Sequence, residues 1–132
     1  MGLLSWLFPS AEDKMAKARA ALEAGDHASA RDAVWGMDQP EAVALREQAE
    51  NGLVLANLDA ARSWMEAGDE DRVRIHLELA DELHKGGLEA AFRETRRALR
   101  ELRAKHQAEE DQRAREEQAR LKKEEAEKAA AQ

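Results

Sequence analysis

Four histidines are the side chains of this chain best suited to acid–base or metal chemistry: His27, His76, His84 and His106. His76 and His84 lie eight residues apart, roughly on one helix face, but neither belongs to a zinc-binding His-Glu-x-x-His pattern. Asp81 precedes His84 by three residues, the spacing of helical neighbours. The four serines lie in no nucleophile motif, and no glycine-rich phosphate loop is present. The sequence therefore predicts surface histidines and a chain that is not an enzyme, without metal or cofactor.

Five arginines recur at helical spacing in the second half of the chain and form a basic stripe. In the favoured interpretation they face water or pair with the acidic remainder of the protein. A second interpretation makes them a docking face for an acidic partner. RNA binding is the weakest of the three, because no aromatic residue that could stack on bases accompanies the arginines. The stripe consists of Arg93, Arg96, Arg97, Arg100 and Arg103.

The first ten residues are the most hydrophobic stretch, and three interpretations of them stay open. They fold back over the first two helices and add to the core, or they bind a protein partner or a second copy. In the third, residues 2–8 lie in a membrane surface as a short amphipathic anchor, which the lack of a basic residue before Lys14 disfavours. The stretch is too short to span a bilayer and lacks the features of a signal peptide. Its large apolar side chains are Leu3, Leu4, Trp6, Leu7 and Phe8.

The composition favours one small, nearly all-helical domain. Charged residues make up 37% of the 132 residues, Gly and Pro are few, and Cys is absent. The lack of Cys excludes disulfides and thiol catalysis and agrees with a cytoplasmic location. Residues 1–86 carry 9 basic and 17 acidic side chains, a balance of −8, whereas residues 87–132 carry 12 and 11. This acidic body argues against general nucleic-acid binding, which needs cations to neutralise phosphates.

Apolar periodicity and capping residues predict five helices. Ser10 is suited to cap the first, with Asp13 three residues on. Gly25 and Gly68 are suited to end helices, because glycine reaches the left-handed conformation without a Cβ clash. Gly52 could divide the third helix, since glycine costs about 1 kcal/mol relative to Ala in a helix interior; one long helix is favoured. The helices are expected over residues 11–24, 27–37, 40–67 and 70–85, and from 88 onwards.

Each predicted helix carries an apolar face at helical spacing. Trp35 and Trp64, at helix ends, are expected to plug the core, and an exposed Trp would mark an interface. The inward residues of the first, second and fourth helices are Met15, Ala18, Ala21, Leu22, Ala30, Ala33, Val34, Met37, Val73, Leu77 and Ala80. The buried stripe of the third helix is expected to comprise Val43, Leu45, Ala49, Leu53, Ala56, Ala60 and Trp64.

The fifth helix begins with an apolar seam of the coiled-coil type, with steps of four and three residues. This seam either caps the helices before it or binds another chain. Beyond Lys105 the seam is lost, and residues 106–132 are expected to form a charged, solvated, fraying helix. The seam consists of Leu88, Phe92, Thr95, Leu99 and Leu102, of which the four apolar residues are candidate partner-binding residues.

Two junctions of the chain share a pattern of small residues around Gly-Asp, 43 residues apart. At these junctions the chain resembles the tetratricopeptide repeat family over residues 11–85. That family repeats every 34 residues, and its members pack helical hairpins into scaffolds that bind other proteins. The resemblance implies antiparallel helical hairpins and a role in protein–protein interaction. The matching residues are Ala18, Gly25, Asp26, Ala30 and Val34, then Ala61, Gly68, Asp69, Val73, Leu77 and Ala80.

The sequence thus predicts an all-α protein with three parts: an apolar segment 1–10, a helical domain 11–105 and a charged helical tail 106–132. We expect a non-catalytic adaptor or assembly subunit that self-associates or co-assembles with a protein partner, through the N-terminal segment and the fifth helix. The alternative is a peripheral membrane protein held by residues 2–8.

Overall fold

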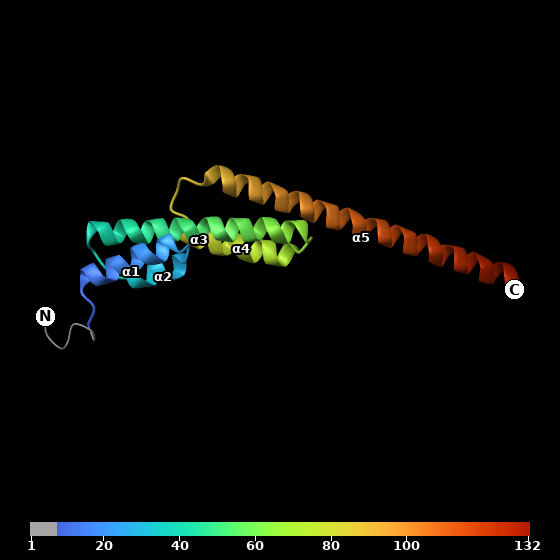
Figure 1. Cartoon of the computed structure of the whole chain (residues 1–132). Helices are drawn as coiled ribbons and strands as arrows, with labels where there is room; N and C mark the ends of the chain where they lie inside the picture. The colour runs from blue at the N-terminus through green and yellow to red at the C-terminus, as the bar shows by residue number, and fades with distance from the viewer. Residues whose placement is uncertain (1–7) are drawn as a thin grey trace.

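The computed structural model describes residues 8–132, and within them it contains five α-helices and no strand. The predicted all-α fold class is therefore confirmed. Figure 1 shows α1 and α2 along the first half of α3, and α4 along its second half. The last helix, α5, begins beside this body and then extends far beyond it. The helices are α1 (Ala11–Glu23), α2 (His27–Ala33), α3 (Pro40–Glu66), α4 (Glu70–Leu83) and α5 (Glu89–Ala131).

The capping residues predicted from the sequence set the ends of the helices. Ser10 Oγ accepts a hydrogen bond from the Asp13 amide at 3.1 Å, and the Asp13 carboxylate accepts one from the Ser10 amide at 3.3 Å. Gly25 has φ +76°, and the amide of Asp26 donates to the carbonyl of Ala21 at 2.8 Å. This bond satisfies a carbonyl at the end of α1, as in a Schellman motif.

The second Gly-Asp junction repeats this geometry between α3 and α4. Gly68 has φ +73°, and the Asp69 amide donates to the Trp64 carbonyl at 3.0 Å. The Asp69 carboxylate then accepts the Arg72 amide at 3.1 Å and caps α4. The same short pattern therefore ends one helix and begins the next at both junctions.

Two helices are shorter than the sequence predicted. α2 ends at Ala33, four residues early, because the chain turns through Val34 and Trp35 into Gly36 at φ +77°. α4 ends at Leu83, two residues early, with His84 already extended before the glycine pair that follows. In both places a glycine with positive φ follows, and the chain leaves the helix before reaching it.

The third helix is continuous, as favoured, and Gly52 lies inside it. The ring of His27, at the start of α2, occupies the space beside this glycine. A Cβ built on Gly52 would lie 2.2 Å from His27 Nδ1. The glycine therefore lets α2 and α3 approach closely at this point.

The body contains two hydrophobic clusters. The first lies among α1, α2 and the first half of α3, around Met15, Ala18 and Val34. The second lies among the second half of α3, α4 and the start of α5, around Leu58, Val73 and Phe92. The two clusters use different faces of α3.

This change of face corrects the predicted stripe of α3. Val43 and Leu53 are only half-buried, and Ala56 is exposed. The buried apolar positions advance by five residues between Ala49 and Val54, which rotates the apolar face by about 140° at 100° per residue. The expectation was wrong because it assumed one buried face along the whole of α3, whereas the two halves pack in separate clusters. The buried apolar residues of α3 are Ala42, Leu45, Ala49, Val54, Leu58 and Ala61.

Only the beginning of α5 contacts the body. Phe92, Thr95 and Leu99 are buried, whereas residues 107–132 are all exposed. With 43 residues, α5 is about 65 Å long at 1.5 Å per residue. The helix continues to Ala131, and it has no buried residue after Leu99.

Candidate interaction surfaces

The seam of α5 lies inside the molecule. Phe92 and Leu99 keep 2% and 6% of their surface and belong to the second hydrophobic cluster. Leu88 packs against that cluster from its edge, and Leu102 is half-buried. The structure therefore uses these candidate partner-binding residues to cap the body rather than presenting them on an open face.

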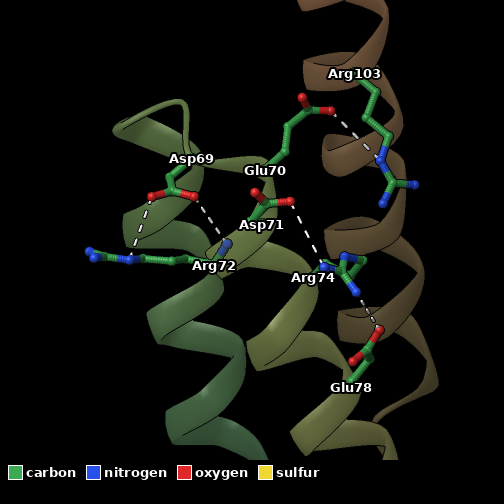
Figure 2. A network of polar contacts seen from close by, with 7 residues as sticks. All are labelled: Asp69, Glu70, Asp71, Arg72, Arg74, Glu78 and Arg103. Carbon is green, nitrogen blue, oxygen red and sulfur yellow. Dashed lines mark hydrogen bonds and ion pairs between the residues drawn. The ribbon is translucent and has the colours of Figure 1, made fainter.

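The arginines of the basic stripe are all exposed, but they do not have the same surroundings. Arg96 reaches Asp81 at 2.5 Å and lies over the ring of Phe92. Arg103 pairs with Glu70 at 3.7 Å, as Figure 2 shows, and Arg97 pairs with Glu101 of its own helix at 3.8 Å. Three of the five thus have carboxylate partners.

The contact at Glu70 also involves a histidine. His106 Nδ1 lies 2.9 Å from a Glu70 oxygen, so two residues of α5 meet one carboxylate at the start of α4. The nearby pairs of Figure 2, such as Arg74 with Glu78 at 3.3 Å, are exposed at the surface of α4. Exposed pairs of this kind contribute about 0–1 kcal/mol each. Glu70 differs from them because it joins two helices.

Arg93 and Arg100 form no ion pair with any residue in the range 8–132. Together with Arg96, they line a pocket of about 260 Å³ where α4 ends and α5 begins. His84 and Phe92 also line it, and their ring centres are 4.4 Å apart. Among residues 8–132, the basic stripe meets an aromatic pair at this pocket.

The N-terminal candidate residues are mostly outside the described part of the chain: Leu3, Leu4, Trp6 and Leu7 precede residue 8. Phe8 is described and is 72% exposed. The three interpretations of this segment therefore stay predictions.

Trp35 is exposed to 62%, and its expected role as a core plug is wrong. The turn after α2 carries it outward, and the Arg31 guanidinium lies 4.5 Å from the centre of its ring. Trp64, by contrast, packs against the second cluster as predicted. Figure 1 shows the start of α1 and the α2–α3 connection near the same end of the body. Phe8, three residues before α1, and Trp35, in the α2–α3 connection, are both exposed. We call Phe8 and Trp35 the aromatic end.

A buried carboxylate, Glu50, was not anticipated from the sequence. It keeps 4% of its surface and lies between cations from three parts of the chain. Arg31 of α2, Arg46 of α3 and Lys85 after α4 approach its oxygens at 3.6, 3.5 and 3.4 Å. Arg46 lies four residues before Glu50, a spacing that indicates an ion pair within one helix. The contacts of Glu50 with Arg31 and Lys85 depend on the tertiary fold. This cluster joins the two halves of the body.

The histidines are dispersed over the fold. His76 Nδ1 contacts the Asn57 side chain at 3.0 Å, and His27 and His84 each have one buried ring nitrogen without a hydrogen-bond partner. Within residues 8–132 no three His, Asp or Glu side chains converge as metal ligands. The helices described there include none that is both long and apolar enough to cross a bilayer.

Comparisons of the chain with protein-family models, with curated proteins and with solved structures found no match. The proposals below therefore depend on the geometry of this chain alone.

Proposed function

We propose that this protein is a non-catalytic interaction module whose helices form hairpins of the tetratricopeptide type, and that it self-associates or assembles with another protein. The aromatic end is its proposed contact surface. Exposed Trp and Phe side chains are enriched at the centres of protein interfaces, where they bury large areas with little loss of conformational entropy.

The exposure of Trp35 is the single observation that carries this proposal. A side chain of this size gains several kcal/mol from burial, roughly 25 cal/mol per Å² of apolar surface removed from water. The body nevertheless leaves it at 62% exposure, and Phe8, before α1, is 72% exposed. The neighbouring Arg31 guanidinium lies over the ring, a cation–π contact worth about 0.5–1 kcal/mol at exposed sites.

The oligomeric state tests the proposal. We expect wild-type protein at micromolar concentration to exceed the monomer mass in sedimentation equilibrium, and Trp35→Ala to shift it toward monomer. Leu55→Ala is the matched control, because Leu55 is also exposed, to 47%, but lies in the middle of α3. If the wild-type protein is stably folded and remains monomeric, the proposed self-association is wrong. If wild type and Trp35→Ala bind the same partner equally, the aromatic end is not the contact surface.

Attachment to a membrane surface through residues 2–8 is the second candidate. The exposure of Phe8 and Trp35 near one end of the body favours it, since aromatic side chains concentrate at membrane interfaces. Deleting residues 2–8 should then abolish co-sedimentation with phosphatidylcholine vesicles. Unchanged sedimentation of the deletion variant, or none by the full chain, would reject the anchor.

A further inference from the structure

The pocket between α4 and α5 has more hydrogen-bond donors than the chain itself uses. Arg93 and Arg100 form no ion pair among the described residues, although Arg93 acts electrostatically on Glu89, and His84 Nε2 is buried without a hydrogen-bond partner. Buried polar atoms are almost always paired in native proteins, so an unpaired one in the wall of a pocket indicates a missing partner. The two guanidinium groups suit an anionic group, and so does His84 in the tautomer that is protonated at Nε2.

Two contacts hold the walls of this pocket in place. Arg96 is fixed between Asp81 at 2.5 Å and the Phe92 ring at 5.2 Å from its centroid. Glu89 accepts the Gly87 amide at 3.0 Å, and backbone hydrogen bonds at Glu89 and Gly87 hold the pKa of this carboxyl below its ordinary value. An ordered wall reduces the entropy lost when a ligand binds.

The charge around the pocket limits what it can hold. Three guanidinium groups face two carboxylates, Asp81 and Glu89, which leaves an excess of one positive charge. This excess matches a singly charged carboxylate better than a doubly charged phosphate. A planar carboxylate also fits the paired N–H groups of a guanidinium.

We propose that this pocket binds a carboxylate side chain, Asp or Glu, from an acidic segment of a partner protein. Arg93 and Arg100 would hold the carboxylate, and the half-buried His84 ring would contact the apolar part of the same segment. This inference shares with the proposed function only the premise that the ligand is a protein, and it involves residues separate from the aromatic end.

The rest of the molecule disfavours nucleic acid as the occupant. Residues 1–86 carry a net charge of −8, which repels a polyanion that extends beyond the pocket. Phe92 keeps only 2% of its surface and cannot stack on a base. A short segment with one or two carboxylates avoids this repulsion because it engages the pocket alone.

Fluorescence anisotropy with a labelled short peptide that carries one glutamate between alanines tests the proposal at low salt. We expect the double substitution Arg93→Glu/Arg100→Glu to weaken binding at least about tenfold, as reversal of paired charges does at interfaces. The neutral pair Arg93→Gln/Arg100→Gln perturbs the helix less. Its affinity for the peptide should lie between those of this variant and wild type. His84→Phe keeps an aromatic ring against Phe92 and should weaken binding about threefold through loss of its donor.

The matched control is Arg113→Glu/Arg115→Glu, which makes the same charge change at exposed positions of the same helix. It should retain wild-type binding. The proposal is overturned if Arg93→Glu/Arg100→Glu and Arg113→Glu/Arg115→Glu weaken peptide binding equally, or if neither variant weakens it. A labelled hexathymidylate that binds more tightly than the peptide would overturn the choice of a protein carboxylate. Oligomeric state is measured separately, so failure here leaves the test at Trp35 unaffected.

Discussion

Gly52 shows how a single residue sets the distance between two helices. In an isolated helix, replacing glycine by Ala stabilises by about 1 kcal/mol. Here the space for the added methyl group is filled by the His27 ring, with its nearest atom at 2.2 Å. The close approach of α2 and α3 therefore reverses the sign expected from helix propensity.

Gly52→Ala should lower the free energy of unfolding by about 1–2 kcal/mol, the usual cost of forcing extra atoms into a packed site. Urea denaturation measures this. In the His27→Ala background the same substitution should instead stabilise, by up to about 1 kcal/mol, because the ring no longer occupies the site. Stabilisation by Gly52→Ala in the wild-type background would contradict this account.

Asp26 at the start of α2 gives a prediction for pH. A hydrogen bond from the Ser29 side chain, then one from its backbone amide, lowers the Asp26 pKa below 3.8. The charged carboxylate is favoured in the folded state, so its stabilisation is complete above pH 3.8 and is lost as pH falls through the lower, folded pKa. Ser29→Ala should raise the Asp26 pKa toward 3.8. The hydrogen bond from the backbone amide of residue 29 remains and keeps part of the lowering.

Carboxyl carbon NMR shifts, followed as a function of pH, measure the Asp26 titration in each variant. Ser63→Ala is the control, since the Ser63 hydroxyl donates to the Asp59 carbonyl near the end of α3 and has no contact with Asp26. A titration midpoint of Asp26 that Ser29→Ala leaves unchanged would show that the serine hydroxyl does not act on it.

The elements of the body are held together by both cores and by Glu50. Replacing Glu50 by Ala leaves three cations facing one another without their shared carboxylate. Arg31, Arg46 and Lys85 keep partial access to water, which limits the loss to about 1–3 kcal/mol. Thermal unfolding of Glu50→Ala should show this decrease, whereas Glu47→Ala, an exposed acid one turn earlier, should change stability by less than about 0.5 kcal/mol. Equal effects of the two substitutions would show that the cluster adds nothing.

How far the sequence predicts each element depends on whether its signal is local. Caps and turns such as Ser10 and the Gly-Asp junctions were predictable because their hydrogen bonds join residues three to five positions apart. The buried face of α3 was not, since the shift after Ala49 depends on which helices pack against each half. The exposure of Trp35 and the pocket beside Arg93 have the same origin, because both depend on where neighbouring helices stop.

At the scale of the whole molecule, the exposed part of α5 divides the chain into a packed body and a projecting helix (Figure 1). Side chains such as Arg120 and Glu124, 3.2 Å apart, support this helix by pairing along its own surface. Such pairs contribute about 0.2–0.5 kcal/mol each and weaken with salt. Without tertiary packing, the helicity of such a segment depends on its own residues and on temperature. The helicity of residues 107–132 should therefore change with salt concentration without a change in the stability of the body.

Truncation after residue 110 tests this independence, because it keeps His106 against Glu70 while removing the exposed turns. We expect the shortened chain to unfold within about 2 °C of the full chain, since no core residue is lost. The difference between their circular dichroism spectra should show a helix whose signal falls as salt rises from about 0.05 to 1 M, while the truncated chain changes little. A drop of several degrees in Tm, or a tail signal insensitive to salt, would mean that residues 111–132 pack against the body or against another copy.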